Sequence, residues 1–104
     1  MSVSKIESSA SFADFVASDK LTVVDFFATW CPPCQMIAPI LEQFAAQYPS
    51  VQFIKVDVDE EEELTSEHQI QAMPTFMFFK NGNKIPSFAG ANQQMIEDTI
   101  KNNL

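Results

Sequence analysis

The sequence predicts an α/β fold in which four helices cover the two faces of a central mixed sheet of about five strands. Three observations support this prediction. Apolar, strand-like segments alternate with amphipathic segments, the connections between them are short, and the chain has 104 residues. That length closes one hydrophobic core and is too short for a second. We therefore expect residues 1–104 to form a single domain, a three-layer sandwich.

The N-terminal quarter predicts a short edge element, a helix and a central strand. A first strand is expected near Val3 to Ile6, followed by a helix from about Phe12 to Ser18 with Ser11 as its cap. Leu21 to Phe27 is an almost continuous apolar run rich in Val and Phe. Such a run is typical of a strand buried on both faces.

The middle of the chain predicts two further helices around a second parallel strand. After the cysteines, apolar residues recur at helical spacing up to Tyr48, and we expect Pro39 to kink this helix. Val51 to Val58 alternates apolar and polar residues as a strand does. The acidic residues from Asp59 onwards favour the start of a short helix that reaches about His68, a residue that we expect at the surface.

The C-terminal part predicts a hairpin and a last helix. Thr75 to Lys80 is an apolar strand, and Asn81-Gly82 supplies the residues of a tight turn into Lys84 to Ala89. Pro86 cannot donate a ladder hydrogen bond, so its strand is expected at the edge of the sheet. Asn92 is expected to cap the last helix.

Composition and charge exclude several classes of function. The net charge is −8, and the six Lys and Arg residues form no cluster that would bind nucleic acid. No apolar stretch approaches the roughly 18 residues of a membrane span. The first residues lack the apolar core of a signal peptide, so we expect a cytoplasmic protein.

Only two cysteines occur, Cys31 and Cys34. A disulfide between them closes a very small loop and stabilises the fold little, so a catalytic or metal-binding pair is the natural interpretation. A structural zinc ion needs about four ligands, and His68 is the one other Cys or His in the chain. Hence we expect no metal and favour redox chemistry over a zinc site or an incidental pair of core cysteines.

The position of the pair predicts a role for each thiol. Cys31 falls at the cap of the predicted helix, where free amides and the positive end of the helix dipole favour a thiolate. Cys31 is therefore the candidate nucleophile. Cys34, one turn further, is the candidate resolving thiol. Trp30 directly precedes the pair and is expected to flank the thiols at the surface.

Asp25 is the second candidate for chemistry. It stands within Val23-Val24-Asp25-Phe26-Phe27, and burial of a carboxyl group there would raise its pKa. Such a group is suited to accept and donate a proton. The alternative is an Asp on a partly solvated strand face.

Several separate segments make the chain resemble the thioredoxin family over its whole length, in particular its cytosolic eukaryotic branch. These segments are Val23-Val24-Asp25-Phe26, Ala28-Thr29-Trp30-Cys31, Met36-Ile37-Ala38-Pro39, Val56-Asp57-Val58-Asp59, Met73-Pro74-Thr75-Phe76 and Phe88-Ala89-Gly90-Ala91-Asn92.

The resemblance implies further site residues. It implies that the Met73-Pro74 peptide bond is cis and packs against the disulfide. It also implies that the substrate groove is lined by Trp30, Met73, Pro74, Gly90 and Ala91. It also implies that Asp25 exchanges protons with the resolving cysteine through water and that Lys55 modulates it.

The resemblance also implies how the protein is used. The expected function is reduction of protein disulfides by a monomer that is recycled by thioredoxin reductase. The NADPH and FAD of that cycle belong to the reductase, so this chain itself needs no cofactor. Peroxiredoxins and ribonucleotide reductase are the expected kinds of substrate.

Two departures from the family pattern leave alternatives open. Pro32-Pro33 replaces the commoner Gly-Pro and resembles tryparedoxins, and Pro32 removes one amide near Cys31. Gln35 replaces a cation found in many relatives. A carrier recycled by a small thiol, similar to tryparedoxin or glutaredoxin, is one alternative, and a binding module without turnover is the other.

Overall fold

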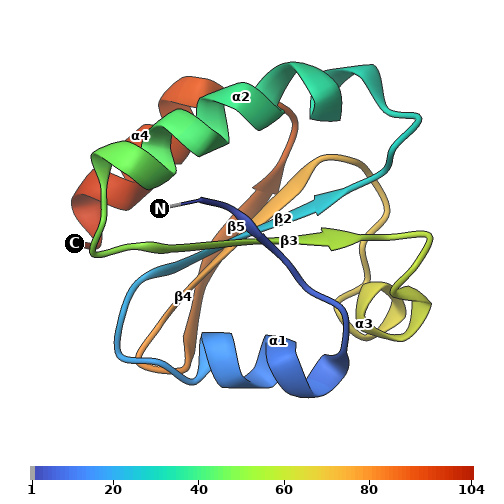
Figure 1. Cartoon of the computed structure of the whole chain (residues 1–104), viewed down its shortest axis with the longest axis horizontal. Helices are drawn as coiled ribbons and strands as arrows, with labels where there is room; N and C mark the ends of the chain where they lie inside the picture. The colour runs from blue at the N-terminus through green and yellow to red at the C-terminus, as the bar shows by residue number, and fades with distance from the viewer. Residues whose placement is uncertain (1) are drawn as a thin grey trace.

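The computed structural model describes residues 2–104, in which strands and helices alternate (Figure 1). The elements are β1 (Ser4–Lys5), α1 (Ser9–Val16), β2 (Thr22–Phe27), α2 (Pro32–Gln47), β3 (Gln52–Asp57), α3 (Glu62–Glu67), β4 (Thr75–Lys80), β5 (Asn83–Ala89) and α4 (Gln93–Asn102). The strands form one sheet in the order β1-β3-β2-β4-β5. Strands β1, β3 and β2 run parallel, β4 is antiparallel to β2, and β5 is antiparallel to β4. The predicted mixed sheet with four helices is confirmed.

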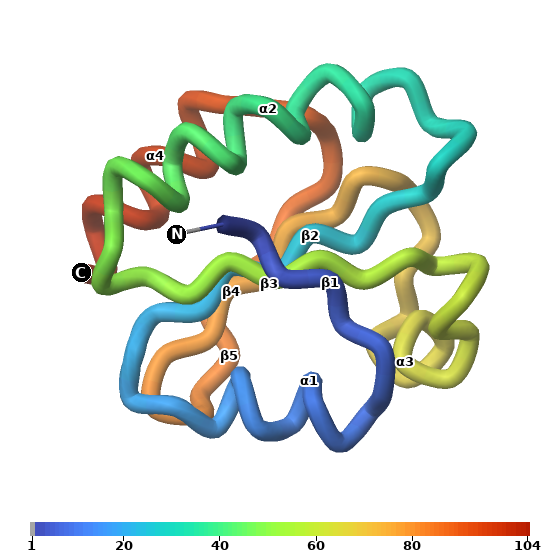
Figure 2. Tube along the Cα trace, in the orientation of Figure 1, coloured from blue at the N-terminus to red at the C-terminus, as the bar shows by residue number. Residues whose placement is uncertain are grey.

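The sheet separates two layers of helices. Helices α2 and α4 lie over one face, and α1 and α3 lie over the other (Figures 1 and 2). The buried side chains divide accordingly into two clusters, with Val23 in the cluster beneath α2 and α4, and Val24 in the other. Strand β2 lies at the centre of the sheet and contributes to both cores, which is the physical reason for its nearly continuous apolar sequence.

The hairpin between β4 and β5 agrees with its turn residues. Lys80 pairs with Asn83 across the turn, and both Asn81 (φ +55°) and Gly82 (φ +76°) have the left-handed backbone that a tight hairpin requires. Strand β5, which contains Pro86, forms one edge of the sheet as predicted.

Two helix starts differ from the predictions. Helix α1 begins at Ser9 because the Ser8 hydroxyl, and not that of Ser11, is the cap: Ser8 Oγ accepts a hydrogen bond from the Ser11 amide at 3.1 Å. Helix α3 begins at Glu62, and the preceding Asp59 and Glu60 lie in a turn whose amides donate hydrogen bonds to the Asp57 carboxylate. Serine and aspartate side chains compete with the helix for these amides, and the local pattern does not indicate which residue does so.

Candidate functional site

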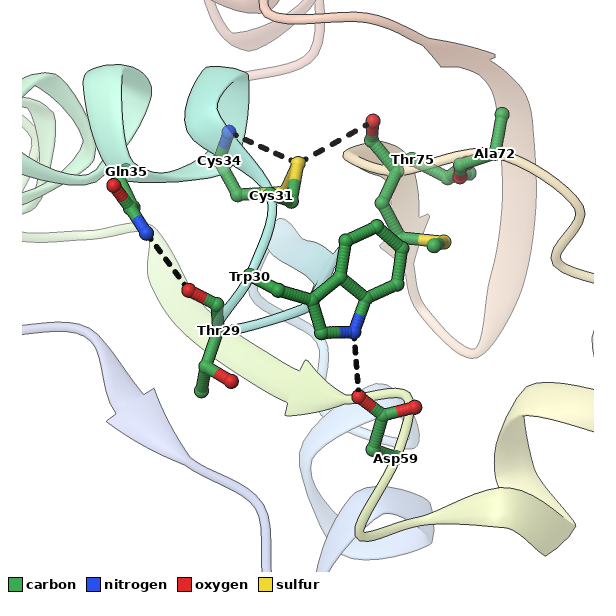
Figure 3. The surroundings of a disulfide bond; sticks show 9 residues. Thr29, Trp30, Cys31, Cys34, Gln35, Asp59, Ala72 and Thr75 are labelled. Carbon is green, nitrogen blue, oxygen red and sulfur yellow. Dashed lines mark hydrogen bonds between the residues drawn. A yellow bond between two sulfur atoms is a disulfide. The ribbon is translucent and has the colours of Figure 1, made fainter.

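The two cysteines form a disulfide where β2 leads into α2 (Figure 3). Cys31 is the N-cap with an extended backbone, and its Sγ accepts a hydrogen bond from the Cys34 amide at 3.2 Å. The Cα atoms of the pair are 5.3 Å apart, within the range that a disulfide spans. Each cysteine is 4% exposed, so a partner reaches the sulfurs only at their surface edge. The predicted cap position of Cys31 is confirmed.

Pro32 and Pro33 occupy the first two positions of α2. Amides in the first turn of a helix have no acceptor within the helix, and the fixed φ of proline suits this position. Both rings are exposed. The double proline therefore fits α2 without the loss of an intrahelical hydrogen bond. Pro39 lies inside α2, which continues to Gln47.

Trp30 flanks the disulfide and is 63% exposed, as expected. Its Nε1 donates a hydrogen bond to Asp59 Oδ2 at 2.9 Å (Figure 3). Asp59 belongs to the turn after β3, so this bond fixes the indole against a segment 29 residues away in the sequence. The sequence pattern does not indicate this role of Asp59, because a single Asp within an acidic run gives no sign of so distant a contact.

Met73 and Pro74 lie on the other side of the disulfide. Their peptide bond is cis, and the Met73 carbonyl oxygen is 3.6 Å from Cys31 Sγ. Pro74 is buried, and its carbonyl accepts a hydrogen bond from the Gly90 amide at 2.8 Å. Gly90 has φ +101°, which favours glycine, and the exposed Ala91 follows it before α4. The structure thus joins Gly90 to the Met73-Pro74 segment beside the cysteines.

Asp25 lies on β2 and faces a cavity behind the disulfide. It is 4% exposed, and its Oδ1 has no hydrogen-bond partner among residues 2–104. Burial raises the pKa of Asp25 to about 7, and the nearby positive charge of Lys55 opposes that rise. Lys55 is paired with Asp25 in the register of β2 and β3. Both residues line a cavity of about 260 Å³ whose wall also includes Cys34.

The expectation that Asp25 is buried is therefore confirmed, against the alternative of a partly solvated strand face. Lys55 extends along the sheet, with its Nζ 5.6 Å from the centre of the Phe27 ring. This packing keeps a cation near the carboxyl group without a direct salt bridge to it. A carboxyl group with a pKa near neutrality beside a cysteine is suited to proton transfer at physiological pH.

The environment of His68 differs from the expectation. It was expected at the surface, but its ring is half-buried and lies 5.1 Å from the Phe12 ring and 5.8 Å from the Phe26 ring, measured between centroids. Burial lowers the pKa of His68. The reason is that α3 packs its end against α1, which the sequence pattern of a short acidic helix does not indicate. Among residues 2–104, no three His, Cys, Asp or Glu side chains gather as a metal site would require.

Comparison with known proteins gives consistent similarities. The thioredoxin family model matches residues 3–102. Thioredoxin-1 of Schizosaccharomyces pombe is 50% identical over 102 residues, covering 98% of this chain and 99% of that protein. The X-ray structure of Fasciola hepatica thioredoxin has a TM-score of 0.94 at 39% identity, covering 98% of this chain and all of that one.

A further similar chain comes from work on the thiol resolving mechanism in yeast mitochondrial 1-Cys peroxiredoxin via glutathione/thioredoxin systems. It has a TM-score of 0.91 at 38% identity, covering 97% of this chain and 95% of that chain.

Proposed function

This chain belongs to the thioredoxin family and is a dithiol-disulfide oxidoreductase with Cys31 and Cys34 as its redox-active pair, and we propose that it acts as a general reductase of protein disulfides. One observation carries the proposal. The disulfide lies at the start of α2, and its Cys31 sulfur is next to a backbone carbonyl, that of Met73, which a bound peptide would approach.

The proposed reaction has two exchanges. The Cys31 thiolate attacks a sulfur of the substrate disulfide, forms a mixed disulfide and releases the first substrate thiolate. Cys34, as its thiolate, then attacks the Cys31 sulfur, which breaks the mixed disulfide and releases the second substrate thiolate. The substrate gains two electrons, and the protein ends as the Cys31–Cys34 disulfide.

We propose Asp25 as the group that takes the proton from Cys34 before the second exchange. Both residues line the same cavity, and the pKa of Asp25 near 7 means that a useful fraction is ionised at neutral pH. Lys55 would favour that ionised form through its positive charge.

Substrate binding is proposed for the surface around the disulfide, formed by Trp30, Met73-Pro74 and Gly90-Ala91. Support comes from the exposure of the Trp30 indole and from the hydrogen bond that holds Gly90 against Pro74. An extended peptide would pair with the backbone of Met73 in this groove.

We further propose that residues 1–104 work as a single monomeric domain in the cytoplasm and are recycled by thioredoxin reductase with its own NADPH and flavin. Thioredoxins generally work with that reductase and with disulfide-containing substrates. Peroxiredoxins are one proposed class of substrate, supported by the similar yeast chain from the peroxiredoxin study, and ribonucleotide reductase is another. None of the helices within residues 2–104 combines the length and the apolar character of a membrane span.

The direct test is reduction of insulin disulfides by NADPH and thioredoxin reductase. We expect turnover by this protein, no turnover by Cys31→Ser, and accumulation of a mixed disulfide by Cys34→Ser. Glutathione as the only electron donor is the comparison. Turnover with glutathione alone would indicate a carrier recycled by a small thiol, as the Pro32-Pro33 sequence suggests, and no turnover with either donor would favour a binding module.

A further inference from the structure

Two adjoining cavities lead from the surface to Asp25, beneath the first turns of α2. The cavity of about 260 Å³ is bordered by Cys34 and is called the inner cavity here. The other, of about 400 Å³, is called the outer cavity. Asp25, Gln35, Ala38 and Lys55 line both, so the two form a continuous cleft. Buried Asp25 borders both cavities, and buried Cys34 borders the inner one. The cleft is large enough for several water molecules.

Gln35 and Thr29 are exposed residues of the inner cavity wall. Gln35 follows Cys34 in the first turns of α2, and Thr29 lies in the loop that leads to Trp30 and Cys31. Gln35 Nε2 donates a hydrogen bond to the Thr29 carbonyl oxygen at 2.7 Å (Figure 3). This bond joins the segments on either side of the disulfide, and both of its residues line the inner cavity.

We infer that Gln35 is a positioning residue, whose bridge to Thr29 narrows the opening of the inner cavity and limits the access of bulk water from that side to Asp25 and Cys34 during the second exchange. The inference rests on the proposed function, because it assigns Asp25 the proton transfer to and from Cys34. It gives a physical role to a glutamine at a position where a cation in many relatives would place a charge.

The electrostatics of the cleft make this role measurable. Burial is the largest cause of the raised pKa of Asp25, so wider access of water should lower that pKa. The other ionisable groups that line the cleft with Asp25 are Lys55 on β3, and Cys34 and Glu42 on α2. On β4, the residue paired with Asp25 is Phe76, which carries no charge.

The test compares Gln35→Met with the wild-type protein and with Gln43→Met. Methionine has nearly the length of glutamine but cannot donate the bond to Thr29. Gln43 is an exposed residue of the same helix outside both cavities. The reduced proteins react with an aromatic disulfide that releases a coloured thiolate. The first release reports attack by Cys31, and the second reports attack by Cys34.

For Gln35→Met, we expect the midpoint of the pH profile of the second release to fall by about half a pH unit or more, a change of roughly threefold or more in the acid constant. NMR titration of the Asp25 carboxyl carbon should show the same downward shift. Gln43→Met should leave the midpoint of the pH profile and the midpoint of the NMR titration unchanged.

Unchanged midpoints in folded Gln35→Met would overturn the inference, and so would equal shifts in the two variants. Absence of a second release from the wild-type protein would instead contradict the proposed two-step function.

Discussion

At the scale of single residues, Asp25 shows how the fold determines chemistry. The same side chain at the surface would be an ordinary carboxylate. In the fold it lies on β2, between β3 and β4, and is 4% exposed. Its Oδ1 has no hydrogen-bond partner among residues 2–104, so the neutral form of the carboxyl group is favoured. Ionisation of Asp25 therefore destabilises the folded protein. Because buried carboxyl groups with a raised pKa are typical of functional sites, we expect Asp25 to act in the reaction.

Asp25→Asn should therefore stabilise the protein at alkaline pH. The pKa of Asp25 is about 7 in the folded state against 3.8 for a free side chain. The stability that the neutral carboxyl group allows is therefore fully present below pH 3.8 and is lost as the pH rises through about 7. At about 1.4 kcal/mol per pKa unit, the free energy of unfolding of Asp25→Asn should exceed that of the wild-type protein by on the order of 4 kcal/mol above about pH 8. The two should be equal near about pH 4.

Urea unfolding of the oxidised protein at several pH values measures this difference. Asp14→Asn makes the same substitution at an exposed position of α1 and is the matched control. A stabilisation of Asp25→Asn that is the same at all pH values would contradict the explanation from ionisation.

At the scale of elements, the ends of helices place the functional groups. The start of α2 holds Cys31 as its cap, and the start of α4 follows Gly90-Ala91 directly. Asn92 caps α4, with its Oδ1 accepting a hydrogen bond from the Met95 amide at 3.0 Å. The position of the cap therefore also determines where one side of the proposed groove ends.

Asn92→Ala should lower the free energy of unfolding by about 1 kcal/mol, because an amide of the first turn of α4 loses its acceptor. Chemical denaturation of this variant and of Gln93→Ala, in the first position of the same helix, gives the comparison. Gln93→Ala should have a much smaller effect, since no side-chain cap is removed. Equal losses in the two variants would show that the cap is not the cause.

At the scale of the whole molecule, charge and layering set how partners approach. The net charge of −8 includes Asp59, Glu60 and Glu61, which follow β3 on the side where Trp30 meets Asp59. A partner that docks on the Trp30 side of the disulfide therefore meets negative charge. Complementary charge raises association rates more than it raises final affinity.

Reduction of a basic protein substrate should consequently depend on salt. We expect kcat/KM for a basic substrate to fall several-fold when ionic strength rises from about 0.01 M to about 1 M, as the screening length falls from about 30 Å to about 3 Å. A neutral disulfide of low molecular weight is the control and should react at nearly constant rate. A basic substrate with no salt dependence would exclude electrostatic steering.

The sequence by itself determined the features that depend on local interactions. Alternation of apolar segments predicted the sheet and its helices, Asn81-Gly82 predicted the hairpin, and the position of the cysteines after an apolar strand predicted a pair at a helix start. These features follow from backbone geometry within a few residues of each position. The family resemblance extended the list to Met73-Pro74, whose cis bond the structure confirms.

Only the tertiary structure decided the contacts between distant segments. Examples are the Met73 carbonyl beside Cys31, the bond from Trp30 to Asp59, and the half-buried ring of His68. The cleft that connects Asp25 with Cys34 is also a product of packing between β2, β3 and α2. Such contacts depend on how whole elements pack, and no pattern within a single segment specifies which side chain meets which.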